Sequence, residues 1–299
     1  MCGAWRKQYA YPELTPVEVE RIFSDTILNK SIRVVNVTGG EPTLRKDLIE
    51  VIRALTNTCS NLRKIDISTN GIDADEAVDT IEQALAFLLP RKVKLGVSVS
   101  LDGLGQVHDQ IRGVPGAFLG VEKSIPELKE LMTLYPYFSV GLNFTVTGRN
   151  CDELGKVFQY GIDKVMGINF TLAAKSEIGV ESLGVLDSFA LNKSQRSTVA
   201  TFVKGLLERD NIHRQYGEFL LYWLATGRRR GPCAFHKGES ILCEPDGTAY
   251  ACGNFKDFKL GNLLETPFSV LAGRKSGFSE AYRLRCKNCN SNCYIDSAW

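Results

Sequence analysis

The sequence predicts an α/β protein in which a parallel sheet with covering helices is followed by a small cysteine-rich segment. Two observations support this prediction. Apolar, β-branched stretches alternate with stretches of helical periodicity, and six of the nine cysteines lie between Cys233 and Cys293. Strands that alternate with helices are typical of a parallel sheet, because each crossover helix returns the chain to the same end of the sheet. We therefore predict two domains, residues 1–230 and 231–299, with a boundary near Gly231.

The first part contains five strand–helix units after an initial helix. Thr15 can cap that helix, and Pro16 suits its first position. The predicted strands cover residues 32–37, 64–68, 94–101, 139–147 and 168–173, and the predicted helices cover residues 44–55, 73–89, 116–134, 152–164, 193–208 and 214–226. The segment from Leu101 to Arg112 is expected to be a loop. Right-handed crossovers roll such a series toward a barrel, so ligands are expected at the carboxyl ends of the strands.

Composition excludes several classes of function. The 36 basic and 34 acidic side chains leave a formal charge of +2, which is too small to predict a nucleic-acid partner. No apolar run approaches the roughly 18 residues of a membrane span, and the start of the chain lacks the apolar stretch of a secretory signal. We therefore expect a cytoplasmic protein without a membrane partner. In a reducing compartment, nine cysteines favour metal or cluster ligation over disulfides.

Polar motifs follow the predicted strands. The first is Thr38-Gly39-Gly40-Glu41-Pro42, in which two glycines let the backbone approach a ligand and a carboxylate can bind an ammonium group. The others are Ser68-Thr69-Asn70-Gly71, Ser98-Val99-Ser100-Leu101-Asp102-Gly103, His108-Asp109 and Ile111-Arg112-Gly113. In this order, these motifs resemble those of the radical S-adenosylmethionine (SAM) enzymes.

The resemblance implies a partial (β/α)6 barrel similar to a TIM barrel. Enzymes of this family hold a [4Fe–4S] cluster with three cysteines spaced Cys-x3-Cys-x2-Cys, and SAM caps the open iron. Here only Cys2 matches that motif. We expect the first strand and the first two ligands to lie upstream, so that the barrel lacks part of its first unit. Because one thiolate cannot hold a four-iron cluster, the ligand set is incomplete here and activity is expected of a complete protein.

The resemblance also implies a set of SAM-binding residues. Glu41 and the backbone of Gly39 and Gly40, in the loop that ends at Pro42, would hold the amino group of SAM. The other residues implied are Ser100 and Arg112, which match positions that meet the ribose or carboxylate, and Asn70 and Asn143, which would face the same cavity.

Several of these residues have a purely structural alternative. Asn70 can form a turn with Gly71, and Asn143 can be a satisfied polar group at a strand end. Asp102 can cap a loop as readily as act in catalysis, and His108 is expected to shape its loop, as is the adjacent Asp109. No catalytic residue is assigned.

The cysteine-rich segment contains a predicted hairpin, with strands near Ser240–Cys243 and Thr248–Ala251 and a turn at Pro245-Asp246-Gly247. It resembles the SPASM extension of radical SAM enzymes, or its shorter "twitch" form. The resemblance implies one auxiliary [4Fe–4S] cluster, and the cysteines it assigns are Cys233, Cys252, Cys286 and Cys289. Cys293 is expected to be an alternate or second-cluster ligand, and Cys243 a structural residue. A structural zinc site is the alternative for this segment. The preceding Arg228-Arg229-Arg230 is expected to be a solvated hinge.

The activity that the resemblance implies is reductive cleavage of SAM to methionine and a 5′-deoxyadenosyl radical. This radical would remove a hydrogen atom from a peptide or small-molecule substrate, and the auxiliary cluster would accept an electron or bind the substrate. A one-electron donor such as a flavodoxin or ferredoxin would be a partner. The alternative from another class is a non-catalytic scaffold or binding protein whose cysteine-rich tail holds zinc.

Overall fold

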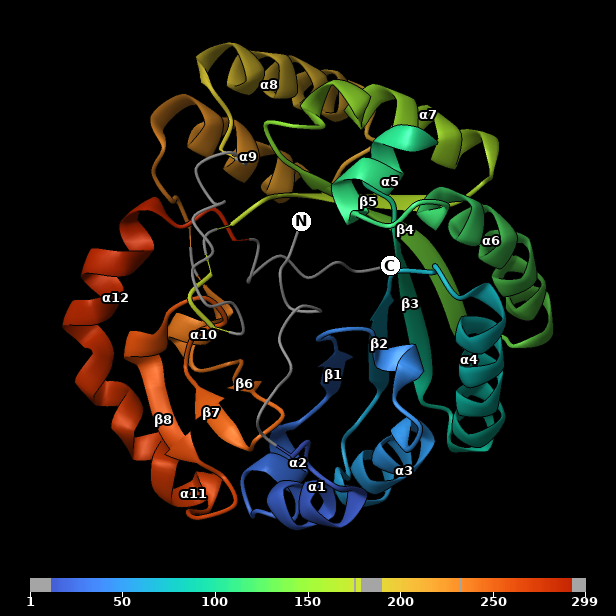
Figure 1. Ribbon diagram of the computed structural model, residues 1–299. Coiled ribbons are helices and arrows are strands. Elements are labelled where there is room, and N and C mark those ends of the chain that lie inside the picture. The colour runs from blue at the N-terminus through green and yellow to red at the C-terminus, as the bar shows by residue number, and fades with distance from the viewer. Residues whose placement is uncertain (1–11, 175, 179–189, 232, 292–299) are drawn as a thin grey trace.

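A five-stranded parallel sheet forms the centre of the molecule. The computed structural model describes residues 12–174, 176–178, 190–231 and 233–291. The strands are β1 (Val34–Val37), β2 (Lys64–Thr69), β3 (Lys94–Ser100), β4 (Phe138–Val146) and β5 (Gly167–Leu172). They pair in the order β1-β2-β3-β4-β5, and every pairing is parallel. The predicted fold class is confirmed: the sheet curves around the centre of the molecule as part of a βα barrel (Figure 1).

Helices cover the outer side of this sheet (Figure 1). Those of the barrel are α1 (Pro16–Phe23), α2 (Leu28–Ser31), α3 (Leu48–Thr58), α4 (Ala74–Leu88), α5 (Gln106–Arg112), α6 (Ala117–Leu134), α7 (Leu154–Asp163), α8 (Lys193–Glu208) and α9 (Arg214–Thr226). Thr15 and Glu18 form a capping box that starts α1, and Asn192 and Gln195 form another that starts α8. Gly227 ends α9 in the left-handed conformation, at φ 67°.

The two faces of the sheet differ in polarity. On the outer face, Ile65 and Ile67 of β2 are fully buried against the helices, as is Leu95 of β3. Alternate residues face the inside of the barrel and are polar and more exposed, as Ser68 and Ser98 illustrate. A parallel sheet buried on both faces would be apolar on both. The alternation therefore indicates an interior open to polar ligands.

Gly96 shows how a charged pair fits on the inner face of the barrel. A β-carbon at Gly96 would overlap the carboxylate of the neighbouring Asp66. This carboxylate forms an ion pair with Lys64 at 2.9 Å. Glycine at position 96 therefore leaves room for a charged pair on the inner face of β2.

The prediction of a loop between Leu101 and Arg112 was wrong over its second half, where the chain forms α5. Gly105 precedes this helix without a side-chain cap, and the helix has only seven residues. The sequence of α5 has neither a capping residue nor a long periodic pattern, so it lacks the usual signals of a helix.

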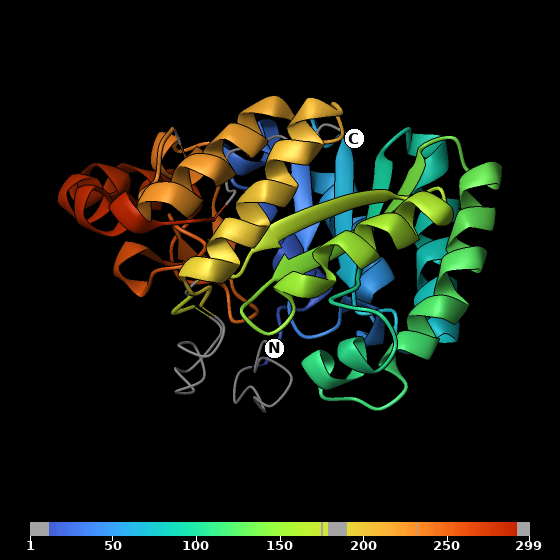
Figure 2. The same ribbon diagram turned by 90° about the horizontal axis from the view of Figure 1, so that it is seen from above.

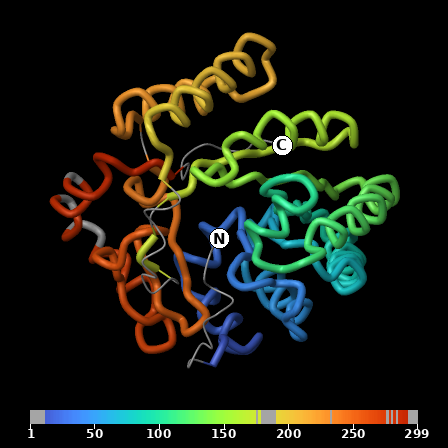
Figure 3. Tube along the Cα trace, turned by 45° about the horizontal axis from the view of Figure 1, so that its top comes forward, coloured from blue at the N-terminus to red at the C-terminus, as the bar shows by residue number. Residues whose placement is uncertain are grey.

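The C-terminal segment contains a small antiparallel sheet of β6 (Leu242–Cys243), β7 (Thr248–Tyr250) and β8 (Lys259–Asn262), in that order. The first two strands confirm the predicted hairpin, and the third was not predicted. The remaining helices are α10 (Ala234–Lys237), α11 (Phe268–Leu271) and α12 (Ser279–Arg285). Figure 2 and Figure 3 show this segment beside the barrel, and in Figure 1 it lies between α1 on one side and α9 on the other.

Hydrogen bonds join the C-terminal segment to both edges of the barrel. The backbone N–H of Leu14, before α1, donates to the Pro245 carbonyl at 2.8 Å. The side chain of Asn290 donates to the carbonyl of Ala173, just after β5, at 2.8 Å. One hydrophobic core runs through both parts of the chain. The segment thus bridges the gap between the first and last strands of the open barrel.

Among the residues described, no helix is both long and apolar enough to cross a bilayer.

Candidate functional site

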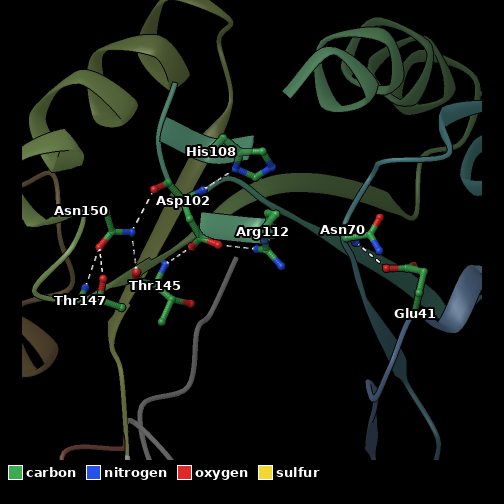
Figure 4. A network of polar contacts seen from close by, with 8 residues as sticks. All are labelled: Glu41, Asn70, Asp102, His108, Arg112, Thr145, Thr147 and Asn150. Atoms are coloured by element: carbon green, nitrogen blue, oxygen red, sulfur yellow. Dashed lines mark hydrogen bonds and ion pairs between the residues drawn. The ribbon is translucent and has the colours of Figure 1, made fainter. Parts of the chain in front are cut away.

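Glu41 lies at the mouth of the barrel, just after β1. One carboxylate oxygen, Oε2, accepts the backbone N–H of Asn70 at 2.7 Å (Figure 4). The other, Oε1, accepts the hydroxyl of Thr43 at 2.9 Å. These donors are neutral, and within the described residues no basic side chain forms an ion pair with Glu41. A carboxylate that is held in place with its charge uncompensated can bind a cationic group such as an ammonium.

The glycines before Glu41 leave open space beside the carboxylate. Gly39 has φ 149°, and a β-carbon at Gly39 or Gly40 would meet no atom within 4 Å. Pro42 is buried at the start of a 3-10 turn, so it shapes the loop instead of facing the open space. The residues at this mouth therefore fit a ligand that carries an amino group against exposed backbone.

The predicted polar residues of β3, β4 and the loop after β2 lie along the same edge of the sheet. Ser100 pairs in register with Asn143, which pairs with Asn169 on β5. The side-chain oxygen of Asn143 lies 3.5 Å from the Asn169 side-chain nitrogen. Asn70 accepts the Ile72 N–H at 2.8 Å and thereby forms the turn that was its alternative role. Ser100, Asn143 and Asn169 keep partly exposed side chains on the inner face.

Arg112 lies at the same mouth and forms an ion pair with Asp102. The Arg112 guanidinium lies 2.6 Å from Asp102 Oδ2, and the Thr145 N–H donates to Oδ1 at 2.9 Å (Figure 4). Asp102 is fully buried, and burial raises the pKa of its carboxyl, although the charge of Arg112 and the Thr145 N–H oppose this effect. Arg112 remains partly exposed, so Asp102 orients a guanidinium that can still contact a ligand.

His108 shapes the loop after β3, as expected. Its Nδ1 accepts the Asp102 N–H at 3.0 Å, which requires that Nδ1 carry no proton. Burial lowers the pKa of His108 to about 4, so the imidazole is neutral at physiological pH. Asp109 accepts the N–H groups of Gly116 and Phe118 at 2.7 and 2.8 Å, and so stabilises the start of α6. Both residues therefore have a structural function in this loop.

Asn150 was not singled out from the sequence, yet it joins two strand ends. It donates to the carbonyls of Asp102 and Thr145 at 2.9 and 3.0 Å, and its oxygen accepts the N–H and hydroxyl of Thr147, both at 2.7 Å (Figure 4). The amide is thus fully satisfied and buried. Its position four residues after the end of β4 is the only signal for it in the sequence, and many loop asparagines share such a position.

The C-terminal segment brings four cysteines together. They are Cys233, Cys252, Cys286 and Cys289, the four that the resemblance implies as ligands of an auxiliary cluster. Burial, together with the charges of the other three thiolates, raises the pKa of the Cys286 thiol to about 12. Burial also raises the pKa of Cys252, and the charges of Cys289 and Cys233 act in the same direction. A bound metal ion or cluster would remove this repulsion between neighbouring thiolates and favour their ionised forms.

Hydrogen-bond donors surround these sulfur atoms. The Asn254 N–H donates to Cys252 Sγ at 3.4 Å, and the Asn254 side chain lies 3.9 Å from Cys289 Sγ. Among the described residues, no three His, Cys, Asp or Glu side chains already have the spacing of ligands to a single metal ion. Thiolates are ligands of both zinc and iron–sulfur clusters, and the N–H donors beside Cys252 and Cys289 are suited to the sulfur atoms of either.

The prediction of a solvated arginine hinge was wrong for Arg229. Its guanidinium is partly buried, donates to the Ser291 carbonyl at 2.6 Å and lies 4.0 Å from Cys289 Sγ. Arg228 and Arg230 on either side are exposed, as predicted. The difference arises because the chain near residue 290 folds back onto the hinge, which local sequence does not indicate.

The remaining cysteines have separate positions. Cys243 lies within the hairpin and donates to the Glu244 carbonyl at 3.6 Å, which fits a structural residue. Burial raises its pKa to about 12. Cys2 and Cys293 lie outside the described residues, so their assignment as metal ligands stays a prediction.

The chain is similar to a known family and to named proteins. The model of the radical SAM superfamily matches residues 1–149. The chain is 25% identical to "Fe-coproporphyrin III synthase" of Methanosarcina barkeri, over 96% of this chain and 76% of that protein. It is 31% identical to "Probable GTP 3',8-cyclase" of Sulfurisphaera tokodaii, over 50% of this chain and 43% of that protein. It is 32% identical to "AdoMet-dependent heme synthase" of M. barkeri, over 52% and 41% respectively, so it spans less than half of these last two relatives.

The fold is also similar to solved structures. The structure described as native anSMEcpe with bound AdoMet aligns with a TM-score of 0.62 and 18% sequence identity, over 97% of this chain and 85% of that one. The same protein with bound AdoMet and a Kp18Cys peptide aligns with a TM-score of 0.59. At this identity the similarity shows the fold alone. The aligned region includes both the barrel and the C-terminal segment.

Proposed function

This chain belongs to the radical SAM superfamily, and from that premise we propose that it uses SAM to abstract a hydrogen atom from its substrate, with an auxiliary [4Fe–4S] cluster on its C-terminal cysteines. The superfamily consists of enzymes that use a [4Fe–4S] cluster and SAM. When bound, these two cofactors supply the radical chemistry, and the protein supplies binding, orientation and exclusion of water.

The observation that carries the proposal is the arrangement of charge at the barrel mouth. Glu41 presents an uncompensated carboxylate beside the open backbone of Gly39 and Gly40, and Arg112 presents a guanidinium. An α-amino acid group has an ammonium and a carboxylate to match these two charges. Glu41 would bind the amino group of SAM and Arg112 its carboxylate, while Asp102 would hold Arg112 in position.

Ser100, Asn70 and Asn143 would contribute further polar contacts to SAM from the same edge of the sheet. The Asn70 side-chain oxygen is already engaged in its turn, so only its amide nitrogen remains for a ligand. We keep Ser100 and Asn143 as the stronger candidates, because both face the interior with partly exposed side chains.

For the auxiliary cluster, the ligands would be Cys233, Cys252, Cys286 and Cys289. This cluster would accept an electron from a substrate radical or bind the substrate directly. A one-electron donor of the flavodoxin or ferredoxin class would supply the reducing electron for SAM cleavage. Stoichiometric zinc in place of iron would instead support the scaffold alternative.

The substrate class is a peptide or a small molecule, and the relatives favour the latter. The relative that aligns over most of this chain is named for Fe-coproporphyrin III, a tetrapyrrole, and the other two are named for GTP and heme. Because two of these relatives are synthases named for a tetrapyrrole product, a tetrapyrrole precursor is the first substrate class to test.

The test is the formation of 5′-deoxyadenosine from SAM under anaerobic conditions with dithionite, measured by mass spectrometry. We expect a protein that carries all three cysteines of the Cys-x3-Cys-x2-Cys motif to form it, and its Glu41→Ala variant to lose most of the yield. Equal yields from these two proteins would contradict the function given to Glu41, and no 5′-deoxyadenosine from the iron-loaded protein with the full motif would contradict the proposed activity.

A further inference from the structure

We infer that Arg229, with Asn254, sets the reduction potential of the cluster on the C-terminal cysteines; the inference rests on the proposed function, which assigns that cluster. Arg229 is a positioning residue here, since it acts through Cys289 and touches no reacting atom.

The contacts of Arg229 bring a permanent positive charge to the cysteine cluster. Its Nη1 lies 4.0 Å from Cys289 Sγ and donates to the Ser291 carbonyl at 2.6 Å. This contact places the guanidinium beside one of the four sulfur atoms. Because arginine stays protonated in proteins, this charge does not vary with pH.

Asn254 adds dipoles to the same sulfur atoms. Its backbone N–H donates to Cys252 Sγ at 3.4 Å, while its side-chain nitrogen lies 3.9 Å from Cys289 Sγ and 2.5 Å from the Ser291 hydroxyl. Asn254 is itself fixed, because its carbonyl accepts the Glu177 N–H at 2.6 Å. Cys289 thus has one cation and one amide within 4.0 Å of its sulfur.

The fold anchors Arg229 from several sides. Its own N–H donates to the Lys287 carbonyl at 2.7 Å, between Cys286 and Cys289 in sequence. Its guanidinium carbon lies 5.2 Å from the centre of the Phe219 ring on α9. The indole of Trp223, also on α9, donates to the Asn288 carbonyl at 3.1 Å. A barrel helix therefore positions the charge over the cysteine loop.

This arrangement favours the reduced form of a cluster. Reduction by one electron makes an iron–sulfur cluster and its thiolates more negative, and hydrogen bonds to the sulfurs are among the factors that set its potential. A partly buried cation stabilises that added charge more than an exposed one, because solvent screens the exposed charge. Arg229 should consequently raise the potential, which makes the cluster a better electron acceptor.

The adjacent Arg228 provides a matched control. It carries the same charge one residue away, yet its side chain is exposed. Arg228→Gln therefore removes the same charge from the same segment without removing a contact to sulfur.

The experiment is a redox titration of the reconstituted protein, monitored by electron paramagnetic resonance and by iron content. The Cys233→Ala/Cys286→Ala variant identifies which signal belongs to the C-terminal cluster. We expect Arg229→Gln to shift the reduction equilibrium about tenfold against the reduced form, about 59 mV for one electron. Asn254→Ala should shift it in the same direction by less, Arg229→Lys should shift it less than Arg229→Gln, and Arg228→Gln should leave it near the wild-type value.

The outcomes separate this inference from the proposed function. If the wild type assembles no cluster that depends on Cys233 and Cys286, the proposed auxiliary cluster is wrong. If the cluster assembles but Arg229→Gln shifts its potential no more than Arg228→Gln does, and Asn254→Ala does not shift it, the inference about Arg229 is wrong while the cluster stands. The Asn254→Ala variant keeps the test decisive if Arg229→Gln assembles less iron.

Discussion

The barrel mouth and the cysteine cluster are built in different ways. At the mouth, Glu41, Asp102 and Arg112 are held by hydrogen bonds and an ion pair that exist without a ligand. In the cluster, the four thiols come from three segments, and burial and the neighbouring thiolates raise the pKa of Cys252 and of Cys286. The fold therefore fixes the side chains of the barrel mouth without a ligand, whereas the arrangement of the cysteine cluster depends on the metal group that it binds. Folding of such a metal region is coupled to metal binding.

The largest effect is expected where the thiols are removed. Replacing Cys233 and Cys286 together with Ala should abolish the iron–sulfur absorbance of the C-terminal region, because two remaining thiolates cannot hold a four-iron cluster. Visible absorption after anaerobic reconstitution measures this. Cys59→Ala is the control, since Cys59 is a buried thiol on the barrel side, at the end of α3. Unchanged iron content in the double variant would contradict the ligand assignment.

At the mouth, removing one partner of the buried ion pair should destabilise the fold. Arg112→Gln leaves Asp102 buried without its cation, and we expect the free energy of unfolding to fall by about 3 kcal/mol. Asp102→Asn should cost about 1 kcal/mol, because an amide oxygen can still accept the Thr145 N–H. Urea denaturation measures both. Equal losses from the two variants would show that the pair does not determine the stability of the mouth.

The neutral His108 should make stability depend on pH. Burial lowers its pKa from 6.5 to about 4 in the folded protein, so the unfolded chain binds an extra proton between these values. Its contribution to stability is present above pH 6.5 and is lost as the pH falls toward 4. Between pH 6.5 and 5 the loss should be about 1.5 kcal/mol.

The variant His108→Asn isolates this dependence. Asn keeps an acceptor for the Asp102 N–H but does not titrate, so denaturation at each pH should show a shallower loss of stability than in the wild type. The exposed His213 is the control, and His213→Asn should leave the pH dependence unchanged. Equal slopes for His108→Asn and the wild type would contradict a neutral buried imidazole.

The smallest expected effect is the change in the Kd for SAM when Glu41 is replaced. Glu41→Gln keeps the shape and the acceptor oxygen of the side chain but removes its charge, so the Kd for SAM should rise about tenfold. Isothermal titration calorimetry under anaerobic conditions measures this. Glu76→Gln, at an exposed position in the first turn of α4, should leave the Kd unchanged. A Kd for Glu41→Gln equal to that of the wild type would argue against an ammonium contact.

Local signals explain which parts of the fold could be predicted from sequence. The bounds predicted for α8 and α9 match the structure, because Asn192 and Gln195 form a capping box and Gly227 adopts a positive φ. The α5 helix was missed since it is short and lacks a side-chain cap. The β8 strand was also missed, because Lys259–Asn262 has four residues and a glycine, without an alternating pattern.

The same difference between features with and without local sequence signals applies to the candidate sites. Motifs at strand ends predicted the mouth, because parallel strands bring their carboxyl ends to one edge. The resemblance to the SPASM extension implied the set of cysteines. The environment of Arg229 could not be predicted, since it arises from contacts with residues about sixty positions away, such as Cys289 and Ser291. Such contacts exist only after the chain has folded.

The metal content of the wild-type protein tests the central claim most directly. Iron, sulfide and zinc should be measured after anaerobic purification and reconstitution, alongside the Cys233→Ala/Cys286→Ala variant. We predict about four iron and four sulfide per chain that the variant lacks, as a [4Fe–4S] cluster on these cysteines requires. One zinc per chain with no iron, lost in the same variant, would contradict the account and favour a structural zinc site.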